Sequence, residues 1–195
     1  MRIVFGGAFN PVTIGHMKIV EFLKEKYPKC KFTFLPVSSA YTKRSLASNF
    51  HRLNMLNLAI EGLEDVNVSP LELNDSDFLG TYQSLIRLSD MYDEEIYFVM
   101  GADNLQTIDK WINASGLLSE FKFIVLARNT IDIEKQLKAH PLLKKFSENF
   151  VIYKNFDMNV SSTEFRKTFN KDFVPKEVYD YIIDNNLYGG DLDAL

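Results

Sequence analysis

Short apolar runs alternate with longer amphipathic stretches along the 195 residues of the chain. An apolar run bounded by turn-forming residues predicts a buried strand, because a strand covered on both faces exposes neither side to water. Such runs predict strands at residues 2–5, 31–37, 66–73, 96–100, 121–127 and 150–153. Apolar residues spaced three and four apart predict helices at 13–27, 51–62, 81–92, 162–169 and 175–186, with one or two short helices within 105–120.

This alternation predicts an α/β protein: a Rossmann-like, doubly wound parallel sheet with helices on both faces. No internal repeat or linker interrupts the pattern, so a single domain is expected over residues 1–195. In such sheets ligands bind beyond the carboxyl ends of the strands. Glycines 6 and 7, residues 36–43 and residues 101–104 each follow a predicted strand, and functional residues are expected there.

Composition narrows the function classes. No apolar run approaches the roughly 20 residues of a membrane span, and the N-terminus shows no signal segment. A single cysteine and three histidines argue against a protein-bound metal. The net charge of −4 argues against non-specific nucleic-acid binding. The composition predicts a cytoplasmic protein with neither a nucleic-acid nor a membrane partner.

Residues 6–16 read GGAFNPVTIGH, directly after the first predicted strand. Gly6 and Gly7 allow close approach of the backbone to another group, and Asn10-Pro11 marks a turn before a helix. The exposed N–H groups at that helix start attract phosphate, and His16 could donate to a phosphate oxygen. The same residues also fit a tight strand-to-helix turn with a partly buried histidine. Spacing alone leaves both interpretations open.

The stretch GGAFNPVTIGH resembles the GGxFxPxHxGH signature of the HxGH nucleotidyltransferases, specifically the bacterial nicotinate-mononucleotide adenylyltransferases. Three further stretches match that family in order. They are FVMGADNLQTIDKW at residues 98–111, VSSTEFR at residues 160–166 and VPKEVYDYIIDNNLY at residues 174–188. The resemblance therefore covers essentially the whole chain.

The resemblance implies transfer of AMP from ATP to the phosphate of nicotinate mononucleotide, which yields nicotinic acid adenine dinucleotide and pyrophosphate in NAD biosynthesis. The attacking phosphate is already ionised at neutral pH, so the reaction needs positioning and charge neutralisation rather than a general base. His16, Lys43 and Arg166 are the implied catalytic residues, with Mg²⁺ carried in on ATP. The implied partners are these small-molecule substrates, and the chain could form a homo-oligomer.

Further site residues are carried over by matching each motif. Asp103 would accept from the adenosine ribose hydroxyls, and Trp111 would stack on the pyridine ring. The ATP-binding set is Gly6, Gly7, Ala8, Phe9, Thr13, Gly15, His16, Gly101, Asp103, Ser161, Ser162, Thr163 and Arg166. The mononucleotide-binding set is Asn10, Lys43, Thr81, Tyr82 and Trp111.

Simpler interpretations compete with several of these assignments. Ser161 and Ser162 fit an ordinary helix cap, and Asp103 fits a cap of the helix that follows it. Lys43 fits a solvated surface lysine.

The chain departs from the family pattern at three places. Thr13 replaces the first histidine of the signature, as in the related pantetheine-phosphate enzymes, and only Lys43 remains of a PPHK segment. Leu79 and Gly80 replace a serine and a tyrosine beside Thr81, which leaves the choice between a pyridine acid and amide open. The alternatives are nicotinamide mononucleotide or phosphopantetheine as acceptor, or a nucleotide-binding sensor without catalysis. Trp111 and the C-terminal match argue against phosphopantetheine.

Overall fold

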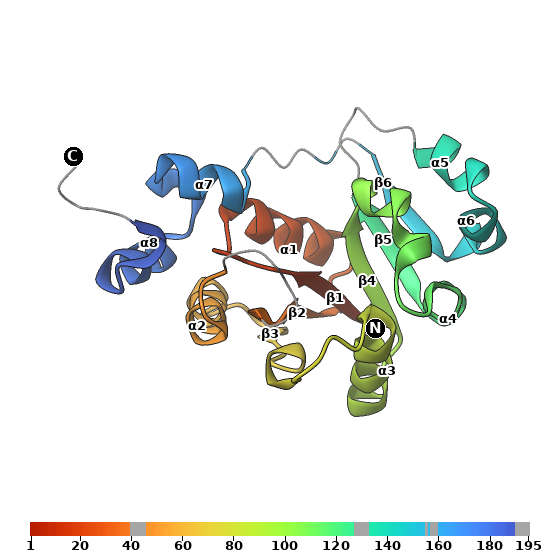
Figure 1. Cartoon of the computed structure of the whole chain (residues 1–195), viewed down its shortest axis with the longest axis horizontal. Coiled ribbons are helices and arrows are strands. Elements are labelled where there is room, and N and C mark those ends of the chain that lie inside the picture. The colour runs from red at the N-terminus through yellow and green to blue at the C-terminus, as the bar shows by residue number, and fades with distance from the viewer. Residues whose placement is uncertain (40–45, 127–132, 155, 157–159, 190–195) are drawn as a thin grey trace. The chain divides into compact units, whose positions relative to one another are not determined.

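A computed structural model describes residues 1–39, 46–126, 133–154, 156 and 160–189 of the chain (Figure 1). Its strands are β1 (Arg2–Gly7), β2 (Lys31–Pro36), β3 (Val66–Val68), β4 (Ile96–Gly101), β5 (Lys122–Leu126) and β6 (Phe150–Tyr153). Its α-helices are α1 (Ile14–Lys26), α2 (Asn49–Ala59), α3 (Thr81–Tyr92), α4 (Ala114–Glu120), α5 (Ile133–Ala139), α6 (Pro141–Lys145), α7 (Ser162–Thr168) and α8 (Lys176–Asp184). Short 3₁₀ segments are η2 (Glu72–Asn74), η3 (Ala102–Gln106), η4 (Ile108–Lys110), η5 (Ser147–Asn149), η6 (Lys171–Phe173) and η7 (Leu187–Gly189).

The strands are hydrogen-bonded in the order β3-β2-β1-β4-β5-β6, and the pairs β2·β3, β1·β4, β4·β5 and β5·β6 are parallel. This is the order of a doubly wound sheet, in which the direction of strand addition reverses between β1 and β4. The prediction of a Rossmann-like α/β fold is confirmed. The carboxyl ends of β1 and β4, where Gly6 and Gly101 lie, are the edge at which such sheets bind ligands.

Three elements differ from the sequence prediction. The strand expected at 66–73 ends at Val68, because Pro70 cannot donate a ladder hydrogen bond and η2 follows it. Helices α5 and α6 were not predicted from the sequence. They are too short for a clear apolar period, and α6 begins at Pro141, whose fixed φ suits a first helical position.

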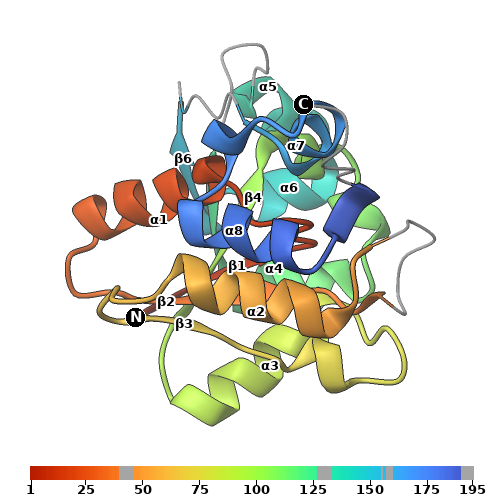
Figure 2. The same ribbon diagram turned by 90° about the vertical axis from the view of Figure 1, so that its left-hand side faces the viewer.

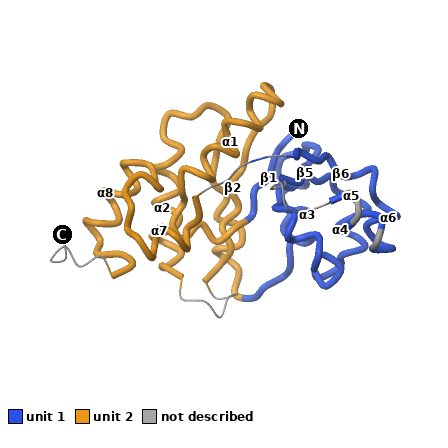
Figure 3. The backbone as a smooth tube through the Cα atoms, turned by 90° about the horizontal axis from the view of Figure 1, so that it is seen from above, with its two compact units in different colours: residues 1–6, 77–157 blue, residues 7–76, 158–195 orange. Residues whose placement is uncertain are grey.

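The described residues group into two compact units (Figure 3). Unit 1 is Met1–Gly6 with Asp77–Asp157, and unit 2 is Gly7–Ser76 with Met158–Leu195. Each unit joins segments that are far apart in the sequence. The single domain expected over the chain stays a prediction.

The core of unit 1 lies between β4, β5 and the helices that follow them. Phe123 on β5 is fully buried, and its ring stacks on Phe150 of β6 at a centroid distance of 5.0 Å. Arg2 at the start of β1 is 5% exposed, because its guanidinium pairs with Glu94 at 2.9 Å and lies over the Tyr92 ring. A buried arginine is thus satisfied here by a carboxylate and an aromatic face.

The core of unit 2 is formed by β2 with α1 and α2. Phe32 and Phe34 on β2 are fully buried, as are Leu23 of α1 and Leu56 of α2. Helices α2 and α8 run side by side (Figure 2). No helix among the described residues is long and apolar enough to cross a membrane.

Truncation of Phe123 tests the core of unit 1. We expect Phe123→Ala to lower the free energy of unfolding by about 3–5 kcal/mol, because it removes buried apolar surface and leaves a cavity. Phe123→Leu should lower the free energy of unfolding by less. Phe50→Ala should lower it by about 0.5 kcal/mol at most, because Phe50 is 66% exposed. Urea denaturation measures all three. Equal losses for Phe123→Ala and Phe50→Ala would contradict this core.

Candidate active site

The loop that joins β1 to α1 turns sharply at Phe9. The φ angle of Phe9 is 46°, in the left-handed region that side chains other than glycine rarely adopt. Its ring is buried and packs edge-on against Phe34 and His16, each at a centroid distance of 5.2 Å. A Cβ atom at Gly7 would lie 3.1 Å from that ring. Gly7 is therefore explained by the inward turn of Phe9, and the turn brings the loop against the start of α1.

His16 is held by the first turn of α1, where Thr13 is the residue before the helix. The His16 Nδ1 atom accepts the backbone N–H of Thr13 at 2.9 Å, and Thr13 Oγ1 lies 2.8 Å from the same atom. A backbone N–H can only donate, so Nδ1 is unprotonated and the neutral ring carries its proton on Nε2. Burial lowers the pKa of His16 to about 4.

The role predicted for His16 is refined by this geometry. The sequence suggests a side chain that neutralises phosphate charge, whereas the structure holds a neutral imidazole with an N–H donor at Nε2. Thr13, the departure from the family signature, keeps a structural task, because its backbone and hydroxyl both contact Nδ1.

Helix α7 docks on the same loop from a distant part of the sequence. The Ser162 hydroxyl donates to the Pro11 carbonyl at 2.7 Å, and Arg166 Nη1 donates to the Asn10 carbonyl. Arg166 Nη2 also donates to Thr163 Oγ1 at 3.4 Å. A guanidinium has five N–H groups, so Arg166 can hold the loop and still donate to an anion.

The serine before α7 has the capping role that the sequence also allows. Ser161 Oγ accepts the backbone N–H of Glu164 at 3.1 Å. The structure therefore brings Ser162 and Arg166 to the loop that leads into α1, the helix whose first turn carries His16.

Asn10 is almost fully buried at the centre of the loop. Its side-chain oxygen accepts the Ala47 backbone N–H and the Tyr188 hydroxyl, both at 2.9 Å. Burial raises the pKa of Tyr188, so its phenol stays protonated and can donate. These contacts tie the loop to the segment before α2 and to the segment after α8. A contact between Asn10 and a mononucleotide stays a prediction.

Arg52 and Tyr188 contact the loop, although sequence reasoning assigned them no role. Arg52 lies in α2 and donates a hydrogen bond to the Ala8 carbonyl, with a distance of 2.8 Å between the two atoms. One signal was available for Arg52: it lies three and four residues before Met55 and Leu56, on the buried face of a helix. A charge inside an apolar stripe indicates a buried polar network. No comparable signal marks Tyr188.

In unit 1, Gly6 and Trp111 both lie against Phe98 of β4. A Cβ atom at Gly6 would be 2.9 Å from the Phe98 ring. Trp111, directly after η4, meets the same ring edge-on at a centroid distance of 6.3 Å. Gly6 is thus a glycine because Phe98 fills the space, and Trp111 remains only half-buried.

Asp103 lies in η3, directly beyond β4. Its carboxylate folds back over Gly101. A Cβ atom built on Gly101 would lie 2.4 Å from the Oδ1 atom of Asp103. The Asp103 side chain is otherwise exposed at the carboxyl end of the sheet. The contact of Asp103 with the adenosine ribose stays a prediction.

The segment before α3 explains one departure from the family pattern. Gly80 has a φ of 85°, and a Cβ atom there would lie 2.8 Å from Ile112 Cβ. Only glycine fits this conformation and this contact. Thr81 is the first residue of α3, and the Tyr82 hydroxyl donates to Glu120 of α4 at 2.9 Å.

Lys43 lies outside the described residues, within 40–45. Within the described ranges, no three His, Cys, Asp or Glu side chains gather where they could hold a metal ion.

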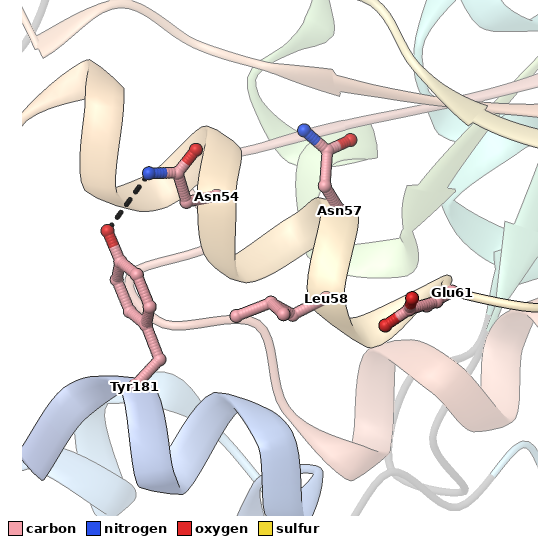
Figure 4. A pocket seen from close by; sticks show the side chains of 5 residues that line it. All are labelled: Asn54, Asn57, Leu58, Glu61 and Tyr181. Carbon is pink, nitrogen blue, oxygen red and sulfur yellow. Dashed lines mark hydrogen bonds between the residues drawn. The ribbon is translucent and has the colours of Figure 1, made fainter. Parts of the chain in front are cut away.

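A groove of about 420 Å³ runs between α2 and α8, and no predicted site residue lines it (Figure 4). Asn54, Asn57, Leu58, Glu61 and Tyr181 line it. Asn54 Nδ2 donates to the Tyr181 hydroxyl at 3.0 Å, so the groove is crossed by a contact that fastens α8 to α2.

Comparison with known proteins gives a consistent result. The model of the cytidylyltransferase-like family matches residues 4–168. A probable nicotinate-nucleotide adenylyltransferase of Acholeplasma laidlawii is 37% identical over 96% of this chain and 97% of its own. One of Aquifex aeolicus is 33% identical over 84% of this chain and 100% of its own.

The fold has solved counterparts as well. The nicotinic acid mononucleotide adenylyltransferase of Plasmodium falciparum, complexed with NaAD, superposes with a TM-score of 0.75. Sequence identity to it is 23%, and the match covers 96% of each chain.

The lowered pKa of His16 predicts an effect on stability. The unfolded chain binds a proton at His16 near pH 6.5 and the folded chain only near pH 4, so acidification across this window favours unfolding. We expect the free energy of unfolding to fall by up to about 1.4 kcal/mol per pH unit from this group. Urea denaturation of the wild type and His16→Gln across the window measures the difference. Parallel pH profiles for both proteins would contradict the neutral imidazole.

Proposed function

We propose a function from one premise: the chain belongs to the cytidylyltransferase-like family and, within it, to the nicotinate-nucleotide adenylyltransferases. The protein is a nucleotidyltransferase that transfers AMP from ATP to nicotinate mononucleotide and releases pyrophosphate. The observation that carries this assignment on the structural side is the docking of Ser162 and Arg166 on the loop beside His16. These residues come from the two motifs expected to bind phosphate.

The loop and the start of α1 are suited to the phosphates of ATP. Helix α1 has 13 residues, and its N-terminal N–H groups carry partial positive charge. Arg166 adds a full charge and a planar donor fork, and neutral His16 adds an N–H donor at Nε2. As negative charge builds on the leaving pyrophosphate, donors already fixed by the loop stabilise it without reorganising.

The acceptor attacks through a phosphate oxygen that is ionised at neutral pH, so no protein group has to remove a proton. The chain's task is to hold that oxygen in line with the α-phosphate of ATP. We assign the pyridine ring to Trp111 and the pyridine carboxylate to Thr81 and the backbone beside it. Asp103 is assigned to the adenosine ribose.

Mg²⁺ is assigned to the ATP phosphates and not to a cluster of protein side chains. When bound with ATP, it supplies further charge neutralisation. We place the protein in the cytoplasm. Lys43 is assigned as an additional cation for the mononucleotide and the transferred phosphate.

Pyrophosphate release tests the reaction. We expect release when the protein is mixed with ATP, Mg²⁺ and nicotinate mononucleotide, because these supply the nucleophile and the leaving group. Parallel reactions contain nicotinamide mononucleotide or phosphopantetheine. Pyrophosphate release with only one of these two compounds would identify it as the acceptor in place of nicotinate mononucleotide. No release with any of the three compounds would favour a nucleotide-binding sensor.

Replacement of Arg166 tests the phosphate site. We expect Arg166→Ala to lower kcat/KM by about 10²-fold, as for loss of an oriented donor to developing charge. The free energy of unfolding should fall by about 1–3 kcal/mol, because the buried Asn10 carbonyl loses its side-chain donor. Lys167→Ala, the exposed neighbour on α7, is the matched control and should retain wild-type kinetics. Near-wild-type turnover of Arg166→Ala would remove this residue from the site.

A further inference from the structure

Arg52 is the largest fully buried side chain among the described residues. It lies near the start of α2, and all its hydrogen bonds go to neutral acceptors. It donates to the carbonyls of Ala8 at 2.8 Å, Val37 at 2.7 Å and Ala47 at 3.1 Å, and to Asn49 Oδ1 at 2.7 Å. Burying a guanidinium is costly unless every direction of the fork is satisfied. This arrangement satisfies Nε, Nη1 and Nη2.

The contact with Ala8 fixes the orientation of one peptide in the loop. The C=O of Ala8 and the N–H of Phe9 belong to one planar trans peptide, so they point in opposite directions. Because the carbonyl is directed at Arg52, the Phe9 N–H is directed away from it. The left-handed φ of Phe9 then turns the next residues toward α1. Arg52 thereby sets which dipoles of the loop face away from α2.

The other contacts join the loop to its two neighbouring segments. The Val37 N–H donates to the Gly7 carbonyl at 3.0 Å, and the Val37 carbonyl accepts from Arg52. The Ala47 N–H donates to Asn10 Oδ1, and the Ala47 carbonyl accepts from Arg52. The start and the centre of the loop are therefore both connected to one guanidinium.

We propose that Arg52 is a positioning residue for the ATP phosphates, because its guanidinium fixes the backbone of the loop between β1 and α1 in the shape that holds a polyphosphate. This inference rests on the proposed use of that loop for ATP. A loop already fixed in its binding shape loses little conformational freedom on binding, which strengthens affinity. The positive charge of Arg52 also adds to the attraction of the loop for phosphate.

A lysine cannot replace this fork. Its single ammonium group donates from one atom, whereas Arg52 reaches three backbone segments from three nitrogens. Arg52→Lys therefore keeps the charge and removes the geometry. Arg2 offers a matched control, because it is also a buried arginine, held by Glu94 and Tyr92 in unit 1.

The experiment measures the Kd of ATP and the Kd of nicotinate mononucleotide by calorimetry for the wild type, Arg52→Lys and Arg2→Lys. Melting temperatures and steady-state KM values for each substrate are measured on the same proteins. For Arg52→Lys we expect the Kd and KM of ATP to rise about tenfold, a change of about 1.4 kcal/mol. The Kd of the mononucleotide should stay within about twofold. For Arg2→Lys we expect a lower melting temperature, with the Kd of ATP and the Kd of the mononucleotide unchanged.

Unchanged ATP affinity in Arg52→Lys, or an equal loss in Arg2→Lys, would overturn the positioning role. If Arg52→Lys does not fold, Asn49→Ala decides, because it removes one acceptor of Arg52 and leaves the arginine in place. We expect the Kd of ATP to rise about threefold in Asn49→Ala. A Kd of ATP equal to that of the wild type would overturn the proposal. A wild-type protein that fails to bind ATP would overturn the proposed function instead.

Discussion

Two main-chain carbonyls in the loop after β1 accept hydrogen bonds from side chains 151 and 156 residues further along the chain. Ser162 and Arg166 are the donors, and Pro11 and Asn10 supply the carbonyls. Buried carbonyls must be paired, and this loop lies in neither a helix nor a strand that could pair them. The shape of the loop therefore depends on α7, and α7 is held in place by the loop.

The same requirement explains the other contacts of the loop. The Ala8 carbonyl is paired by Arg52, and the Asn10 side chain is paired by Ala47 and Tyr188. Each partner comes from a different segment of unit 2. A loop fixed by so many partners is rigid, and rigid donors stabilise developing charge better than mobile ones.

Charge is divided between these groups in a way that suits a polyphosphate. His16 is neutral because burial and the Thr13 N–H both disfavour its protonation at Nδ1. Arg52 and Arg166 retain their charges because a guanidinium does not lose its proton in proteins. The loop thus combines fixed dipoles, one neutral donor and two cations, all of which favour a polyphosphate.

The sequence determined the fold class and the family. Apolar runs located each strand, although the third ends at Val68 and not at residue 73. The helix α3 was predicted over its observed span of Thr81–Tyr92. The order of the four motifs identified the family, and the comparisons confirm it. Only the tertiary structure decided the protonation of His16, the glycine at position 80 and the roles of Arg52 and Tyr188. These depend on contacts between residues far apart along the chain, such as the 178 positions between Asn10 and Tyr188, and such pairings leave no periodic pattern in a sequence.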